Sequence, residues 1–217
     1  MGLTGGIASG KSTISRLLAG LGCLTVDADA IVSGLYRPGQ PGHAAIVARY
    51  GASVLQADQT IDRARLAELA FATEASARQL NELIHPLVLK EQDRLRAELP
   101  ADHADRDLIY VVEATLLIEA GNLDRYDRIV VVTASPDLQL VRALARGMDR
   151  EDAVRRMSRQ LSAAERIAHA DYILNNSGDL SEAQRSVQIL HGLLQSDLVD
   201  KKRGLLKTKT PRQIGGA

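Results

Sequence analysis

The sequence has little that would favour a nucleic-acid-binding, membrane-bound or secreted protein. Tryptophan is absent and aromatic residues make up only 3% of the chain, so few side chains can stack on bases. Lysine plus arginine equals aspartate plus glutamate, at 27 each, and a zero net charge gives no general attraction to nucleic acid or to an anionic membrane. No apolar run approaches the length of a membrane span, and the first residues lack the features of a signal peptide. We therefore expect a cytoplasmic protein with no nucleic-acid or membrane partner.

Cysteine is also nearly absent. Cys23 is the only one in the 217 residues, so no internal disulfide can form, which suits a reducing compartment. It lies in the apolar run from Cys23 to Val26, where we interpret it as a buried strand residue and not as a nucleophile. With 45% apolar and 25% charged residues, the chain has the composition of a globular protein with one sizeable core and room for an inserted subdomain.

Short apolar runs predict the strands of a parallel sheet. The runs are continuous instead of alternating, as expected where helices cover both faces of a sheet. They predict an α/β fold with three layers, α/β/α, and a five-stranded parallel sheet. The predicted strands are residues 1–4, 24–27, 108–112, 128–133 and 172–174. Ligands of such sheets bind beyond the carboxyl ends of the strands, so the residues after each strand are the first place to look for a site.

The residues after the first predicted strand form a phosphate-binding motif. The segment GGIASGKST at positions 5–13 fits the pattern G-x-x-x-x-G-K-[ST] without a gap. The glycines allow backbone N–H groups to turn toward phosphate oxygens, at the N-terminus of the following helix. Lys11 then reaches the β- and γ-phosphates, and Ser12 offers its hydroxyl to Mg²⁺. A glycine-rich turn before a helix is the alternative, but a strand precedes this loop and a helical apolar pattern follows it. We predict a nucleoside triphosphate site that includes Ala8, Ser9, Gly10, Lys11, Ser12 and Thr13.

Two segments interrupt the predicted sheet, and a third follows it. About eighty residues separate the second and third strands, far more than one crossover needs, so we predict a helical insertion with one helix over 75–84 and another beginning at Pro86. A further helix of the same insertion is predicted after Asp62, which can cap it. The segment from Arg142 to Arg166 is helical in pattern and rich in arginine. It is either a solvated helical face or a lid, in which two or three arginines hold phosphate. Residues 201–217 are basic and without periodicity, which favours a disordered tail.

Other residues narrow the class of nucleotide-binding protein. The chain has no Asn-Lys-x-Asp element of a GTPase, and it lacks the signature loop and Asp-Glu strand end of a transporter ATPase. Asp27 and Asp29 follow the second strand, at the same sheet edge as the phosphate loop. One of them can cap the next helix, and the other can orient an acceptor hydroxyl. This combination favours a small kinase. A nucleotide-dependent binding protein whose tail recruits a partner stays as an alternative from another class.

The combined motifs resemble the dephospho-coenzyme A kinase family, to about residue 195. The matching elements are LTGGIASGKST at 3–13, VDAD at 26–29, PG at 38–39, YG at 50–51, DR at 62–63 with Leu66 and Phe71, HP at 85–86, LLIE at 116–119, Arg142 with Arg146, Gln160, and AD at 170–171 through Asn176 and Gly178. The resemblance implies ATP-dependent phosphorylation of the ribose 3′-hydroxyl of dephospho-coenzyme A, with Mg²⁺, as the last step of coenzyme A biosynthesis. Another P-loop nucleotide or small-molecule kinase is the alternative.

The resemblance also implies a division of the chain. It implies a nucleoside monophosphate kinase-like domain over 1–200, with a discontinuous core at 1–35, 104–140 and 167–200. A helical coenzyme-binding insertion at 36–103 and a lid at 141–166 complete it. We expect a monomer or a weak homo-oligomer.

Residue roles follow from the same resemblance. Asp29 corresponds to the carboxylate beside the 3′-hydroxyl, and Lys11 to the lysine on the transferring phosphate. The remaining correspondences are Arg142 and Arg146 as lid cations, Asn176 and Gly178 at the adenine site, and Arg63 and His85 on the coenzyme side. For His85, orientation of the turn before Pro86 is an equal alternative. The family commonly has a proline before the Leu-Leu pair, whereas this chain has VEATLL at 112–117, with Glu113 at the strand's end. Glu113 either supports the water shell of magnesium or pairs with a lid arginine.

Overall fold

The chain folds as two units. We describe a computed structural model in which residues 1–98, 108–121, 123–206 and 210–215 are defined. The first unit comprises Met1–Val26 and Ala101–Ala217, and the second comprises Asp27–Pro100. Within the described ranges, no helix combines the length and the apolar character needed to cross a membrane.

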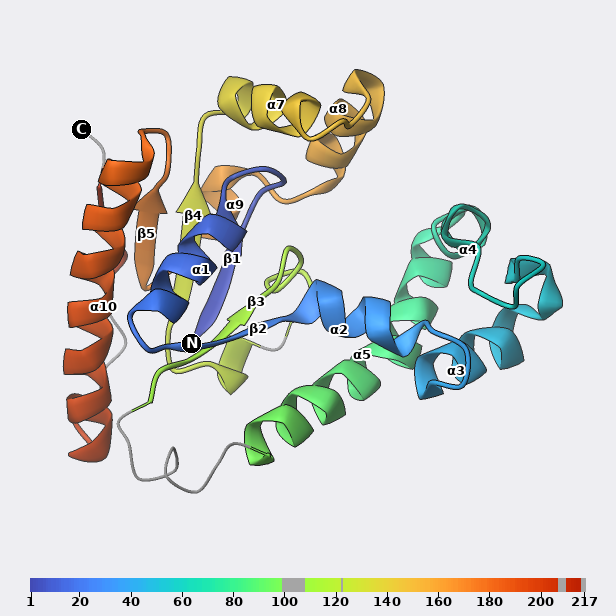
Figure 1. The fold of residues 1–217 in the computed structure, drawn as a ribbon, viewed down its shortest axis with the longest axis horizontal. Helices are drawn as coiled ribbons and strands as arrows, with labels where there is room; N and C mark the ends of the chain where they lie inside the picture. Colours follow the sequence, from blue (N-terminus) through green and yellow to red (C-terminus); the bar gives the residue numbers. More distant parts are fainter. Residues whose placement is uncertain (99–107, 122, 207–209, 216–217) are drawn as a thin grey trace. The chain divides into compact units, whose positions relative to one another are not determined.

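A parallel sheet forms the centre of the first unit (Figure 1). Its strand order is β2-β3-β1-β4-β5-β6, and β1 pairs in parallel with both β3 and β4. The strands are β1 (Gly2–Gly5), β2 (Leu24–Asp27), β3 (Tyr110–Glu113), β4 (Ile129–Thr133), β5 (Tyr172–Asn175) and β6 (Arg212–Ile214). All five predicted strands are present with bounds shifted by at most two residues, so the α/β prediction is confirmed. The predicted number of strands is wrong, because the described sheet has six.

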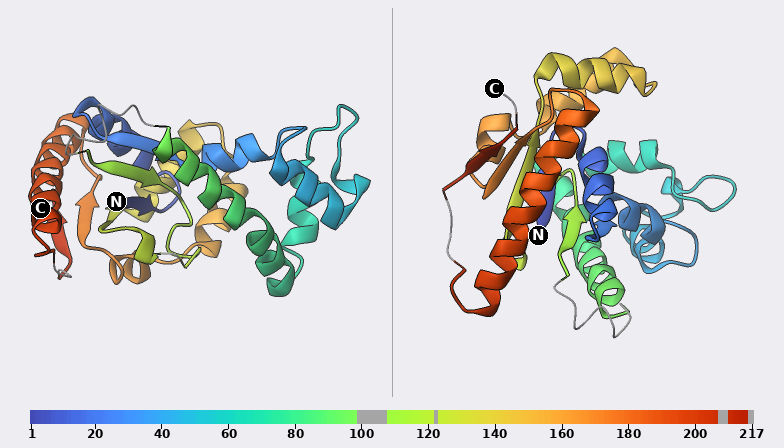
Figure 2. Two further views of the ribbon diagram at one scale, coloured as in Figure 1. Left: turned by 90° about the horizontal axis from the view of Figure 1, so that it is seen from below. Right: turned by 60° about the vertical axis from the view of Figure 1, so that its left-hand side comes forward.

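The additional strand comes from the segment expected to be a disordered tail. β6 pairs in parallel with β5, and the N–H of Arg212 donates to the carbonyl of Asp171 at 3.1 Å; Figure 2 shows the dark red strand beside β5. Ile214 is only 3% exposed and belongs to the main core cluster. The last long helix also extends to Lys202. The prediction of disorder over 201–217 is therefore wrong for the end of α10 and for β6. The burial of Ile214 and the pairing with β5 order β6, which is too short to show a periodic pattern in the sequence.

Helices cover both faces of this sheet. The helices of this unit are α1 (Lys11–Gly20), α7 (Pro136–Ala145), α8 (Arg150–Arg159), α9 (Ala163–Ile167) and α10 (Leu180–Lys202), with a 3₁₀ turn, η2 (Leu123–Arg125). Helices α1 and α10 pack on one face of the sheet and α9 on the other, whereas α7 and α8 pack against each other. Val130 and Val132 of β4 belong to one core cluster, which they share with residues of α1 and α10. Their neighbours Ile129 and Val131 belong to the cluster on the other face, against which Ile167 of α9 packs. The strand is buried on both sides, which explains its continuous apolar sequence.

The second unit is helical, as predicted. It contains α2 (Ala28–Leu35), α3 (Pro41–Tyr50), α4 (Arg63–Ala70) and α5 (Glu74–Ala97), with a 3₁₀ turn, η1 (Ala52–Val54). Helices α2, α3 and α4 all contact α5. The prediction that Pro86 begins a helix is wrong, because α5 runs through Pro86 without a break. A proline removes one helical hydrogen bond, and the buried Ile84 and Val88 on either side of it pack the helix in place.

Candidate active site

The loop between β1 and α1 has the strained backbone of an anion-binding loop. Ala8 has a positive φ of 53° and Gly10 a φ of 98°, and a non-glycine residue in the left-handed region costs about 1–2 kcal/mol. Such strain is typical of functional sites. Lys11 begins α1 and is 8% exposed. Its Nζ donates to the carbonyl oxygens of Gly5, at 3.1 Å, and Gly6, at 3.2 Å. The lysine is thus held against the loop, within reach of an anion bound there.

Two buried polar atoms beside the loop have no hydrogen-bond partner in the described part of the chain. They are Oγ of Ser9, from the loop, and Nη1 of Arg142, from α7. Buried polar atoms in native proteins are almost always paired, so an unpaired hydroxyl and guanidinium at one loop point to a missing ligand. An anion with several acceptor oxygens, such as a phosphate, has the chemistry that both groups require.

A residue after β5 locks the loop. Nδ2 of Asn176 donates to the carbonyl of Ser9 at 2.8 Å. A Cβ atom at Gly10 would collide with the same Nδ2, so Gly10 is required both for its positive φ and for space. The predicted nucleotide-site residues Ser9, Gly10 and Asn176 are therefore in contact, although 167 positions separate Ser9 from Asn176.

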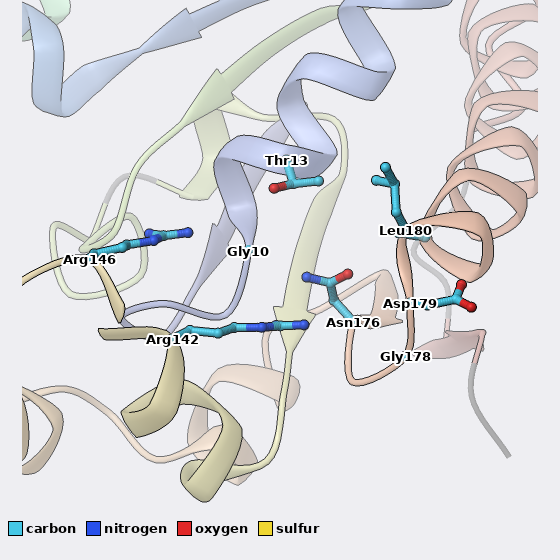
Figure 3. A pocket seen from close by; sticks show the side chains of 9 residues that line it. Gly10, Thr13, Arg142, Arg146, Asn176, Gly178, Asp179 and Leu180 are labelled. Atoms are coloured by element: carbon cyan, nitrogen blue, oxygen red, sulfur yellow. The ribbon is translucent and has the colours of Figure 1, made fainter. Parts of the chain in front are cut away.

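A pocket connects this loop with the two predicted lid arginines (Figure 3). It is lined by Gly10, Thr13, Arg142, Arg146, Asn176, Gly178, Asp179, Leu180 and Ala183. In Figure 3 the side chain of Arg142 extends past Gly10 toward Asn176. Burial lowers the pKa of Arg142, and the nearby charge of Arg146 lowers it further. Two guanidinium groups that repel each other favour a bound anion, which would relieve the repulsion.

Three residues that line the pocket are not among the predicted site residues: Asp179, Leu180 and Ala183. The Asp179 carboxylate caps α10 and accepts the N–H of Glu182 at 2.8 Å. Leu180, the first residue of α10, is 59% exposed. An apolar side chain exposed in a pocket is a surface for a flat apolar group. The sequence could have indicated Asp179 and Leu180, because they directly follow Gly178 and the polar loop after a predicted strand.

Ser12 is the residue of the loop that could supply a ligand to a magnesium ion. Ser12 is exposed in the first turn of α1, beside Lys11, and its hydroxyl is the hard oxygen donor that Mg²⁺ prefers. The described residues contain no group of three or more acidic, histidine or cysteine side chains arranged for a metal. A magnesium ion at Ser12 would therefore take its other ligands from phosphate oxygens and water, as it commonly does in kinases.

The predicted acceptor-side residues all lie in the second unit. Asp27 is the N-cap of α2, and its Oδ1 accepts the N–H groups of Asp29, at 2.8 Å, and Ala30, at 3.1 Å. This assigns the capping role, which the sequence left open, to Asp27. Asp29 is exposed in the first turn of the same helix. The guanidinium of Arg63, the first residue of α4, lies 5.8 Å from the centre of the Tyr36 ring.

His85 lies in a different setting from the predicted turn, whereas Glu113 lies at the end of its strand, as predicted. His85 lies in the middle of α5, so it does not orient a turn before Pro86, and that alternative is wrong. Glu113 is the last residue of β3 and is 9% exposed. It stands opposite Leu3 of β1 in the sheet, one strand away from the phosphate loop.

A parallel α/β sheet with a phosphate-binding loop after its first strand, and with arginines converging on that loop, defines the class of P-loop kinases. The family model for dephospho-CoA kinase matches residues 1–182. The chain belongs to the dephospho-CoA kinase family.

Individual relatives agree with this assignment. The chain is 34% identical to dephospho-CoA kinase of Aquifex aeolicus over 197 residues, which covers 91% of this chain and 98% of the relative. It is 41% identical to dephospho-CoA kinase of Yersinia pseudotuberculosis over 190 residues, with 87% and 89% covered. Its fold is similar to the crystal structure of TT1252 from Thermus thermophilus, with a TM-score of 0.76 at 27% identity and with 89% and 96% of the two chains covered.

Proposed function

We propose that the protein transfers the γ-phosphate of ATP to the ribose 3′-hydroxyl of dephospho-coenzyme A, giving coenzyme A and ADP as the last step of coenzyme A biosynthesis. Membership of the dephospho-CoA kinase family over residues 1–182 supports the reaction. The single structural observation that carries the kinase site is the pair of buried, unpartnered polar atoms at the phosphate loop, Oγ of Ser9 and Nη1 of Arg142.

Positive charge around the loop would stabilise the transferring phosphoryl group. Lys11 exchanges its bonds to the loop carbonyls for oxygens of the β- and γ-phosphates. Arg142 and Arg146 approach the same phosphates from α7 and its C-terminal cap, as part of a lid that we place at about 141–166. Such groups act mainly by positioning and by charge stabilisation. Mg²⁺ bound at Ser12 supplies further neutralisation of phosphate charge when present.

The nucleoside of ATP would occupy the pocket at the loop after β5. Asn176 and Gly178 border the space for adenine, and the exposed Leu180 side chain offers an apolar surface for the base. Ala8, Ser9, Gly10 and Thr13 surround the phosphates through their backbone or side-chain donors. The base end is thus apolar and the phosphate end cationic, which orients the nucleotide.

On the acceptor side, Asp29 would orient and deprotonate the 3′-hydroxyl. Capping of α2 does not require Asp29, because Asp27 performs it. A carboxylate oxygen within reach of the hydroxyl can accept its proton. Arg63 and His85 would bind the coenzyme portion, and the Arg63 guanidinium suits its diphosphate.

An acceptor panel tests the reaction. ADP release is measured with dephospho-coenzyme A and, separately, with nucleosides and nucleoside monophosphates. Turnover with dephospho-coenzyme A alone is expected; turnover only with another acceptor would refute the substrate. Asp29→Asn should abolish transfer while ATP still binds, because the base is lost and the phosphate site is intact. Asp27→Asn is the matched control and should stay active, since asparagine caps helices as well as aspartate does.

The proposal also covers the location, the partners and the oligomeric state of the protein. We expect it to act in the cytoplasm, without nucleic acid, as a monomer or a weak homo-oligomer. Light scattering across a concentration series measures the oligomeric state, and a stable assembly at the lowest concentrations would contradict this part.

A further inference from the structure

A polar cluster around one buried arginine lies beside the phosphate loop, in the first unit. Its members are Arg166 of α9, Gln160 in the segment between α8 and α9, and Glu119. Arg166 is 5% exposed, although its helix has only five residues. Burial of a guanidinium costs several kcal/mol unless its bonds are made. The location of this arginine therefore needs an explanation beyond packing.

The cluster makes direct contact with the phosphate loop through Gln160. Oε1 of Gln160 accepts the N–H of Ile7 at 2.9 Å, so a side chain 153 positions away along the chain holds the backbone of the loop. The same Oε1 accepts a bond from Nη2 of Arg166 at 3.4 Å. One oxygen thus links the loop to the buried guanidinium.

Glu119 anchors the other side of the guanidinium. Its Oε1 lies 3.7 Å from Nη2 of Arg166 and accepts the N–H of Leu161 at 3.4 Å. Glu119 therefore fixes both Arg166 and the residue that follows Gln160. This arrangement restricts the Gln160 side chain from two directions.

The guanidinium also lies beside the start of the loop. A Cβ atom on Gly6 would stand 3.5 Å from Nη1 of Arg166 and 2.6 Å from Oε1 of Gln139, so the space around Gly6 is closed. Nε of Arg166 is buried without a partner in the described part of the chain. Burial lowers the pKa of Arg166, while the acidic charge of Glu119 opposes that shift. Other arginines of the same region, such as Arg155, are exposed and pair within their own helix.

We propose that Arg166 is a positioning residue for phosphoryl transfer, which holds the Gln160 amide against the Ile7 N–H and so fixes the Gly6–Ile7 part of the phosphate loop. This inference rests on the proposed kinase function and extends it to residues outside the predicted site. Nζ of Lys11 donates to the carbonyls of Gly5 and Gly6. A shift of the loop at Gly6 therefore moves the cation that binds the transferring phosphate. Misplacement by about 1 Å can cost roughly 100-fold in rate.

A double-mutant cycle tests the proposal. Arg166→Met and Gln160→Met each remove one link, and each should lower kcat/KM for ATP by about 10- to 100-fold. Because Arg166 acts through Gln160, the double variant should lose no more than the worse single variant, within about threefold. The KM for dephospho-coenzyme A should change by less than about twofold. A merely structural role would lower all of these parameters together with the melting temperature.

Arg155→Met is the matched control. It makes the same chemical change at a side chain that is 53% exposed and pairs with Asp152, and it should leave kcat/KM unchanged. Losses that multiply in the double variant would overturn the proposal, because they would show that Arg166 acts independently of Gln160. Unchanged activity of either single variant would also overturn it.

Two further measurements distinguish a variant that does not fold from a failure of the proposed kinase function. If Arg166→Met does not fold, Gln160→Met alone decides: wild-type kcat/KM would refute the proposal, and a tenfold or larger loss with an unchanged melting temperature would support it. If the wild-type protein turns over no acceptor, the proposed function fails instead. The same cycle measured on the Kd for ATP by calorimetry then still decides the role of Arg166.

Discussion

Shortening Ile214 to alanine tests whether the C-terminal strand is an integral part of the core. Ile214 is 3% exposed and packs in the main cluster with residues of β4, β5 and α10. Isoleucine-to-alanine changes at buried sites cost about 2–5 kcal/mol, from lost transfer free energy and from the cavity that is left. In a protein of this size each kcal/mol lowers the melting temperature by about 2–4 °C. The expected decrease is therefore about 4–20 °C.

The assay is thermal unfolding followed by circular dichroism, at equal protein concentration. Leu205→Ala is the matched control, because this leucine is 57% exposed and its truncation should change stability by less than about 0.5 kcal/mol. If Ile214→Ala melts within about 2 °C of the wild-type protein, β6 frays independently and the reasoning from burial is refuted. A chain that ends before β6 should melt at least as early as Ile214→Ala.

Three further perturbations probe the loop, the core and the thiol. Gly10→Ala should abolish ATP binding, measured by calorimetry, because its Cβ would displace Asn176; retained affinity would contradict the steric argument. Asp197→Asn should lower stability in urea by about 3–5 kcal/mol, because it breaks a buried pair with Arg128 at 2.9 Å, and a loss below about 1 kcal/mol would mean that the pair is dispensable. Burial raises the pKa of Cys23 to about 11, so thiol reagents at neutral pH should label it only after unfolding. The contribution of the Cys23 thiol to the free energy of unfolding is complete below the pKa that the thiol has in the unfolded chain. It should decrease as the pH rises from about 9 to 11.

The sheet was predictable because its pattern is local. Each central strand is buried on both faces, as the alternate packing of Ile129 and Val130 into opposite clusters shows, and so it reads as a continuous apolar run. The phosphate loop was predictable because its chemistry lies within nine adjacent positions. Elements with this kind of signal need no knowledge of the rest of the fold.

The remaining features depend on contacts between distant positions. The pairing with β5 and the core around Ile214 order β6. No local sequence pattern predicts either contact. Helix α5 continues through Pro86 because its buried residues pack against α2, α3 and α4, and tertiary packing outweighs one missing hydrogen bond. Gln160 appeared in the sequence only as part of a resemblance, and its bond to Ile7 N–H required the fold.

Most of the unusual backbone and hydrogen-bond geometry in the described residues gathers at the candidate site; the exceptions are Gln59, with a φ of 66°, and the buried hydroxyl of Tyr50. Ala8 has a φ of 53° without being glycine, and buried atoms of Ser9, Arg142 and Arg166 lack partners in the described structure. Each departure costs free energy that the core must offset. These four residues lie around one loop, although they come from three parts of the chain: the loop itself, α7 and α9. A phosphate group would satisfy the hydroxyl and the Arg142 guanidinium at once. The cluster of unsatisfied groups therefore locates the ligand independently of the motif, and it extends the site to Arg166, which the motif does not contain.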